Sequence, residues 1–269
     1  MIAIIIIVAA LCVLYVLSTR GRKGHPGLGA LRGWGYAHRG LHGNGVPENS
    51  MAAFQAALDG GYGIELDVHL LRDGNLAVIH DASLKRTAGV DIQIEDLSTE
   101  ELSKYPLEET TETIPTFREV LDLYAGKAPI VVELKPERGN HAALAEATCK
   151  MLESYPGAYC VESFDPRCIY WLKKNRPDVI RGQLTENFLA NPKSPLSPAL
   201  KFMLTHQLEN FLVQPDFVAY KFADRKAFSN TLVRKLWGVQ GVTWTITSQA
   251  DYNTAVQEGW LPIFEGFRP

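Results

Sequence analysis

Short apolar runs alternate with longer amphipathic segments along most of the chain. The apolar runs have the length of strands, and they comprise residues 35–40, 62–71, 128–135, 159–164, 179–184, 217–222, 241–246 and 261–266. Between most of them, apolar residues recur every three to four positions, which predicts helices packed on one side. In the segment 50–61, for example, Ser50 is a predicted N-cap and Gly60 a predicted C-cap.

A ninth apolar run, residues 75–81, begins only four positions after the run at 62–71 ends, at the last residue of the sequence "RDGN" (72–75). A parallel crossover needs about a dozen residues or more, whereas Asp-Gly is typical of a tight hairpin. We therefore expect this run to fold back antiparallel, outside the main sheet. Eight strands separated by helices remain, which predicts a (β/α)8 TIM barrel with a small insertion at 82–114, after strand 2. A doubly wound open sheet is the alternative.

The N-terminus has a different pattern. Residues 2–17 contain no charge, and Arg20, Arg22 and Lys23 follow them closely. With Ser18 and Thr19, which are also uncharged, this makes eighteen residues, and a helix of that length measures roughly 27 Å, just enough to cross a bilayer core. The pattern predicts a transmembrane anchor at 1–19, a linker at 20–32 and a catalytic domain at 33–269.

The alternative for the N-terminus is a cleaved signal peptide, but the basic residues lie on the wrong side of the apolar run for one, and no small-residue cleavage motif follows. Basic residues after the span predict a single-pass protein of the cell membrane with a cytoplasmic domain.

Composition agrees with a globular domain, with 46% hydrophobic and 21% charged residues and a net charge of -3. This balance argues against a nucleic-acid partner. Cys149, Cys160 and Cys168 are an odd number without C-x-x-C spacing, so we expect reduced core thiols rather than disulfides or a zinc site.

Polar residues collect at the carboxyl ends of the predicted strands, where barrel enzymes place their active sites. Glu65 and Asp67 share one face of a strand, and Glu133 lies on the next one. Carboxylates at alternate positions on a strand usually form a solvated face. Three that converge could instead hold a hard divalent cation, Ca²⁺ or Mg²⁺.

Basic residues and histidines complete this cluster. Arg39 and Lys135 would complement a phosphate, and His38 and His80 could act as general base and general acid. Each feature alone is weak, because such pairs are common on protein surfaces. Their joint position at predicted strand ends favours phosphodiester cleavage.

The motifs "AHRG", "PENS", "ELDV", "RDGNLAVIHDASLKRTAG", "IPTF", "VELK", "SF" and "WTI" occur in the order seen in glycerophosphodiester phosphodiesterases. From about residue 35 onward, the chain resembles this family. The resemblance implies a barrel like that of phosphatidylinositol phospholipase C, and hydrolysis of glycerophosphodiesters to sn-glycerol 3-phosphate and an alcohol.

The family pattern implies a role for each matched residue. His38 and His80 become the acid–base pair. The implied metal ligands are Glu65, Asp67 and Glu133, and the implied phosphate contacts are Arg39 and Lys135. Phe164 and Trp244 would line the substrate pocket, although plain barrel packing explains them equally well. His69 matches no position of the family pattern and is expected at the surface.

The chain departs from the family at its C-terminus. A Thr-Asp-x-Pro segment often follows the last strand in the family, whereas this chain reads "IFEGFRP". Glu265 is the expected stand-in for the acidic residue.

Two alternatives remain open: a lysophospholipase D acting on membrane lysolipids, and an inactive barrel serving as a membrane-tethered binding module. The order in which the histidines act and the head group of the substrate are also open.

Overall fold

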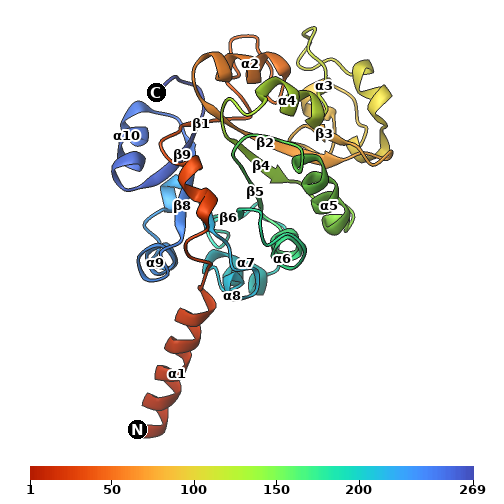
Figure 1. Ribbon diagram of the computed structural model, residues 1–269. Helices are drawn as coiled ribbons and strands as arrows, with labels where there is room; N and C mark the ends of the chain where they lie inside the picture. Colours follow the sequence, from red (N-terminus) through yellow and green to blue (C-terminus); the bar gives the residue numbers. More distant parts are fainter.

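The computed structural model describes residues 1–269 and contains a closed barrel (Figure 1). Its eight parallel strands are β1 (Tyr36–His38), β2 (Gly63–Leu70), β4 (Ile130–Leu134), β5 (Tyr159–Ser163), β6 (Arg181–Thr185), β7 (Phe217–Lys221), β8 (Gln240–Ile246) and β9 (Trp260–Phe264). Strand β1 closes the barrel, because Ala37 pairs with Phe264 on one side and with Ile64 on the other. The predicted barrel is confirmed, and this closure rules out an open doubly wound sheet.

Helices cover the outside of the barrel. They are α2 (Met51–Asp59), α4 (Phe117–Tyr124), α5 (His141–Leu152), α6 (Pro166–Asn175), α7 (Pro198–Thr205), α8 (Asn210–Val213), α9 (Phe228–Thr231) and α10 (Gln249–Gln257), with short turns η4 (Phe222–Asp224) and η5 (Leu232–Leu236). Helix α2 has the predicted caps, Ser50 and Gly60.

Apolar side chains of the strands meet these helices in one large core. Ile64, Leu66 and Val68 face outward into this core, which also contains Phe54 of α2 and Phe117 of α4. The cysteines of the barrel are free and buried, as predicted.

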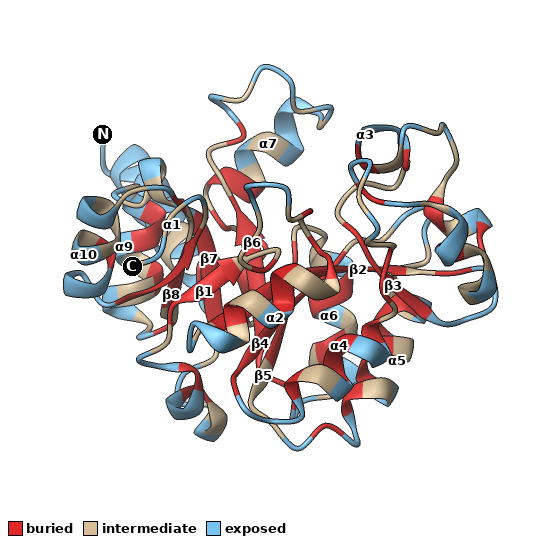
Figure 2. Cartoon of the chain, turned by 90° about the horizontal axis from the view of Figure 1, so that it is seen from above, coloured by how far each residue is buried: buried red, intermediate tan, exposed pale blue.

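The predicted hairpin is also confirmed. Strand β3 (Leu76–Val78) pairs antiparallel with β2, with Val78 opposite Val68. The insertion that follows contains α3 (Lys85–Ala88), η2 (Ile94–Asp96) and η3 (Thr99–Lys104), and has a small apolar core of its own. In Figure 2 this insertion and the segment around α7 flank the barrel.

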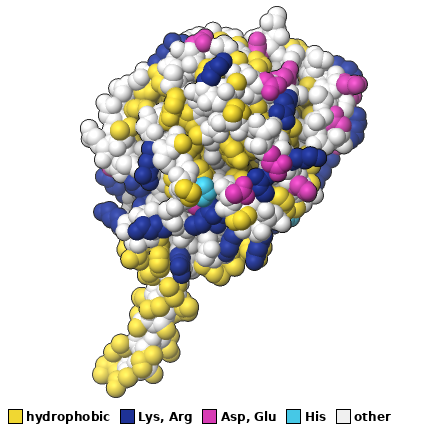
Figure 3. Space-filling model, in the orientation of Figure 1, with side chains coloured by type: hydrophobic (Ala, Val, Ile, Leu, Met, Phe, Trp, Pro, Cys, Tyr) yellow, Lys and Arg dark blue, Asp and Glu magenta, His cyan; other side chains and the backbone are white.

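Helix α1 (Ile2–Ser18) projects away from the barrel, with most of its apolar side chains exposed (Figures 1 and 3). It has 17 residues, and no helix of the structure combines the length and the apolarity that a membrane crossing requires. The expected transmembrane helix is therefore not borne out. The helix covers the whole apolar run and ends at Ser18; the chain then enters the domain, where Thr19 is fully buried and its hydroxyl donates to the Val16 carbonyl.

The residues between α1 and β1, where we expected a linker, lie against the barrel. Turn η1 (Pro26–Leu31) buries Leu28 and Leu31 in a second apolar cluster, together with Tyr36 and Phe217. Arg22 forms a bidentate ion pair with the buried Asp216. This segment closes the end of the barrel opposite the predicted active site.

Candidate active site

A pocket of about 140 Å³ lies at the carboxyl ends of the strands. Eight of the nine predicted site residues line it: His38, Arg39, Glu65, His80, Glu133, Lys135, Phe164 and Trp244. The ninth, Asp67, is buried beside them and contacts Lys135 and Arg39. Parallel strands that end on one side of a closed barrel bring together residues that are more than 200 positions apart.

Glu65, Asp67 and Glu133 form a compact acidic cluster. One oxygen from each carboxylate lies within 4.8 Å of the others, and all three side chains are buried. Burial, followed by repulsion from Asp67 and Glu133, raises the pKa of Glu65 well above its ordinary value. The pKa of Glu133 is raised to about 7, chiefly by burial.

A divalent cation would fit this acidic cluster, because it would remove the repulsion among the three buried carboxylates and coordinate Asp67 Oδ1, which forms no hydrogen bond and whose nearest cationic group is the Lys135 ammonium. Oxygen ligands at this spacing suit a hard cation rather than zinc.

Lys135 and Arg39 partly neutralise the acidic cluster. The Lys135 ammonium lies 2.7 Å from Glu133 Oε1 and 3.1 Å from Asp67 Oδ1. Burial alone would raise the pKa of Asp67, but Lys135, His80 and Arg39 together with the Asn49 hydrogen bond outweigh it and hold this pKa below the ordinary value. Asn49 donates a hydrogen bond of 2.8 Å to Asp67 Oδ2.

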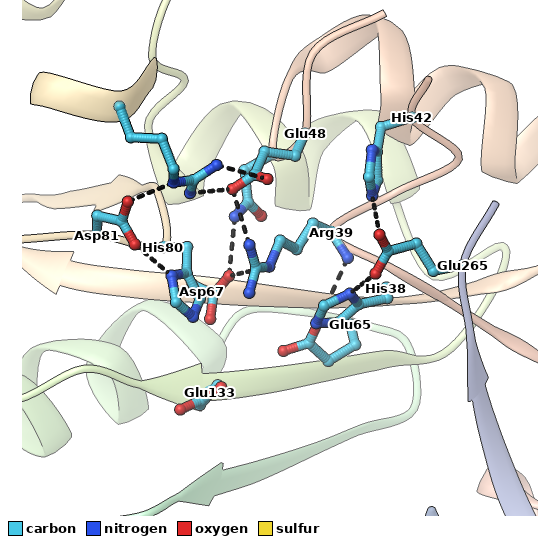
Figure 4. Close-up of polar contacts among 12 residues, drawn as sticks. His38, Arg39, His42, Glu48, Glu65, Asp67, His80, Asp81, Glu133 and Glu265 are labelled. Atoms are coloured by element: carbon cyan, nitrogen blue, oxygen red, sulfur yellow. Dashed lines mark hydrogen bonds and ion pairs between the residues drawn. The ribbon is translucent and has the colours of Figure 1, made fainter. Parts of the chain in front are cut away.

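The two histidines lie on either side of the acidic cluster, and a carboxylate holds each of them in the same way (Figure 4). His38 Nδ1 lies 2.6 Å from Glu265 Oε2, and His80 Nδ1 lies 2.6 Å from Asp81 Oδ1. The other ring nitrogen of His38, Nε2, lies 3.9 Å from Glu65. Since a carboxylate only accepts, each Nδ1 carries the proton, and each Nε2 is left for proton exchange.

A chain of alternating charges links the His80 side of the site to the acidic cluster. Asp81 binds Arg86, Arg86 binds Glu48, and Glu48 lies 2.9 Å from Arg39. Arg39 in turn lies 3.5 Å from Asp67. This network fixes the Asp81 carboxylate and the Arg39 guanidinium in place (Figure 4).

Aromatic side chains form the remaining wall of the pocket. The rings of Phe164 and Trp244 meet edge to face at 5.6 Å, and Phe188 packs on Phe164 at 6.1 Å. Both predicted aromatics therefore line the pocket and pack together.

Two polar residues of this region escaped the sequence reasoning. Glu162 lines the pocket, and burial and Glu133 raise its pKa. Its position two residues before Phe164, on the same strand face, was an available signal. His69, expected at the surface, is buried because β3 and the insertion cover this side of β2, and its Nε2 donates to the His80 carbonyl.

Comparison with known proteins identifies the family. The model of the Glycerophosphoryl diester phosphodiesterase family matches residues 38–264. The chain belongs to this family. It is an enzyme that hydrolyses glycerophosphodiesters to glycerol 3-phosphate and an alcohol.

Several relatives of the chain are phosphodiesterases. The chain is 36% identical over 168 residues to a glycerophosphodiester phosphodiesterase of Bacillus altitudinis, covering 58% of this chain and 68% of that protein. It is 33% identical over 132 residues to a lysophospholipase D of Rattus norvegicus, covering 44% of this chain and 40% of that protein.

Solved structures share the fold. A phosphodiesterase of Oleispira antarctica, solved in complex with the product sn-glycerol-3-phosphate, matches with a TM-score of 0.70 and 23% identity, covering 86% of this chain and 92% of that one. A protein of Silicibacter pomeroyi matches with a TM-score of 0.72 and 19% identity, covering 91% and 95%.

Proposed function

We propose that this phosphodiesterase depends on a divalent cation held by Glu65, Asp67 and Glu133, and that His38 and His80 exchange the protons. One observation carries the proposal: two histidines, each oriented through Nδ1 by a carboxylate, flank a buried acidic cluster. An inactive barrel would have no reason to keep both of these pairs.

The cation is Ca²⁺ or Mg²⁺, because the proposed ligands are all carboxylate oxygens. Stabilisation of negative charge on the phosphoryl oxygens is the chemistry that such a cation supplies when bound. Arg39 and Lys135 add positive charge to the same position, because both side chains line the pocket.

Two steps follow from the positions of the histidines. In the first, one histidine accepts the proton of the glycerol hydroxyl next to the phosphate. The oxygen of this hydroxyl forms a bond to phosphorus, which gives a cyclic phosphate. The other histidine donates a proton to the alcohol as its bond to phosphorus breaks. In the second step, water adds to the cyclic phosphate, the ring P–O bond breaks, and the two histidines exchange roles.

An assay of the full chain on glycerophosphocholine and glycerophosphoethanolamine tests this proposal. With Ca²⁺ or Mg²⁺ we expect turnover, and with a chelator we expect loss of it. His38→Ala and His80→Ala should each lower kcat by at least roughly 10²-fold. His25→Ala, at the opposite end of the barrel, is the control. Full activity in chelator would contradict the metal proposal.

We also propose that α1 attaches the enzyme to a cell membrane, with the barrel on the cytoplasmic side. Its exposed apolar side chains, followed by Arg20 and Lys23, suit insertion beside anionic head groups (Figure 3). Sedimentation with vesicles of phosphatidylcholine and phosphatidylglycerol tests the attachment, and Ile5→Glu with Ile6→Glu should abolish it. A C-terminal reporter that fluoresces only in the cytoplasm tests the side, and a dark fusion would contradict it.

A further inference from the structure

A second cluster of metal-ligating side chains lies behind His38, on the side of its ring that faces away from the acidic cluster. Nδ1 of His38 lies 2.6 Å from Glu265 Oε2, and Nε2 of His42 lies 3.8 Å from Glu265 Oε1 (Figure 4). One ligand atom from each of these three side chains lies within 4.8 Å of the others. The proposed reaction uses His38 and gives no role to His42.

His42 has an unsatisfied nitrogen that faces this cluster. The residue lies in the loop that follows β1, and its Nε2 atom is buried without a hydrogen-bond partner. Burial is the main reason why the pKa of His42 is lowered, so its ring is neutral at neutral pH. A neutral imidazole is the form that binds a metal ion, and an ion at this position would give Nε2 a partner.

The donor atoms select the kind of metal. Two imidazole nitrogens and a carboxylate suit zinc, with water as the fourth ligand, whereas Ca²⁺ and Mg²⁺ prefer oxygen ligands alone. Neighbouring donor atoms around a tetrahedral zinc ion are about 3.3 Å apart. The 2.6 Å pair must therefore open, and the 3.8 Å pair must close, by roughly 0.5 to 0.7 Å. The Glu265 side chain is 35% exposed, so an ion can enter from solvent.

Zinc on Nδ1 would prevent His38 from exchanging protons. A neutral imidazole has one proton and one free nitrogen. Without zinc, Glu265 keeps that proton on Nδ1, and Nε2 is free to accept another. With zinc on Nδ1, the proton of the neutral ring lies on Nε2, which can accept none. Zinc also takes the Glu265 carboxylate, which stabilises the protonated ring.

We propose that His38, His42 and Glu265 form an inhibitory zinc site, separate from the site of the activating cation. Zinc takes the place of the hydrogen bond between His38 and Glu265, and the ring keeps its single proton on Nε2. The inhibition rests on the proposed function, because it acts through the catalytic role of His38. The binding of zinc does not depend on that role.

Binding of Co²⁺ tests the site without any need for turnover. Tetrahedral Co²⁺ with nitrogen ligands absorbs strongly in the visible, whereas six-coordinate Co²⁺ among oxygen ligands absorbs weakly. We expect a strong band when Co²⁺ is added to the full chain in saturating Ca²⁺, and loss of that band on addition of Zn²⁺. His42→Ala and His42→Gln should lack the band, and His25→Ala should keep it. The absence of a band in the unmodified chain, or its persistence in both His42 variants, would overturn the site.

Hydrolysis of glycerophosphocholine in saturating Ca²⁺ or Mg²⁺ tests the inhibition. Zinc should inhibit the unmodified enzyme, and both His42 variants should raise the inhibitory zinc concentration by at least about tenfold, each relative to its own zinc-free rate. Equal inhibition in these variants, or relief by more Ca²⁺ or Mg²⁺, would place the zinc in the acidic cluster and overturn the proposal. No turnover with any cation, with the cobalt band intact, would overturn the proposed function instead.

Discussion

Nδ1 of His38 lies 2.6 Å from Oε2 of Glu265, although the two residues are 227 positions apart in the chain. His38 ends the first strand of the barrel, and Glu265 directly follows the last. Closure of the barrel brings the two strand ends side by side. The C-terminal departure from the family motif thus supplies the carboxylate that orients one histidine.

Glu265→Gln should lower kcat roughly 10- to 100-fold and leave KM nearly unchanged. The amide keeps the volume but loses the charge that fixes the ring and stabilises its protonated form. Steady-state kinetics on glycerophosphocholine measure the effect, with Glu153→Gln on the exposed surface as the control. Glu265→Asp should recover part of the activity. A rise in KM with kcat unchanged would mean that Glu265 serves substrate binding instead.

Asp81→Asn should move one limb of the pH–rate profile to lower pH. Burial lowers the pKa of His80, whereas its bond to Asp81 raises it, so removal of that charge lowers the pKa further. If His80 is the base, the acidic limb moves, and if it is the acid, the alkaline limb moves. The profile of kcat/KM therefore assigns its role. Two unmoved limbs would show that His80 does not titrate in catalysis.

Cation binding should raise the melting temperature, and it should weaken below neutral pH. A ligand that binds only the folded state stabilises it. Glu133, with a pKa of about 7, must lose a proton to bind a cation, so the apparent affinity should fall up to about tenfold per pH unit below pH 7. Melting curves with Ca²⁺ or Mg²⁺ measure both effects. Asp67→Asn should abolish them, and an equal shift in that variant would place the cation elsewhere.

Glu209→Gln should stabilise the protein at alkaline pH. Both oxygens of this buried carboxylate lack a hydrogen bond, and burial raises its pKa to about 8. The folded state holds the proton more tightly than the unfolded one, so stability falls as the pH rises from about 4.5 to about 8. Glu209→Gln has no carboxylate to ionise at this position, so this fall in stability with rising pH is absent from the variant. The gain in unfolding free energy should reach a few kcal/mol, at most about 4, at pH 8 and vanish near pH 4.5.

Denaturation at both pH values measures the gain from Glu209→Gln. The exposed Glu153→Gln is again the control. A gain of equal size at both pH values would mean that the change acts through packing and not through the charge.

Local patterns were enough to predict the strands and the hairpin. Strand length, helical period and the short "RDGN" turn are properties of neighbouring residues, and they led to eight parallel strands and one reversal. The site residues were predictable because a barrel brings all of its strand ends to one rim.

Pairings across the barrel could not be predicted in the same way. The contact of Arg86 with Glu48 and that of Glu265 with His38 depend on side chains from distant segments. His69 was expected at the surface because it matches no position of the family pattern, but the insertion covers it. The first helix covers its whole apolar run but ends at Ser18, inside the expected anchor at 1–19, and Thr19 already lies buried in the domain.

The attachment of α1 has a mechanical consequence. The Trp237 indole donates to the Val16 carbonyl and the Tyr15 ring stacks on Phe228, while Arg22 is tied to Asp216. These contacts leave no flexible linker between the helix and the barrel, so the two reorient together as one rigid body. The surface to which α1 binds therefore also fixes the direction in which the active-site pocket opens.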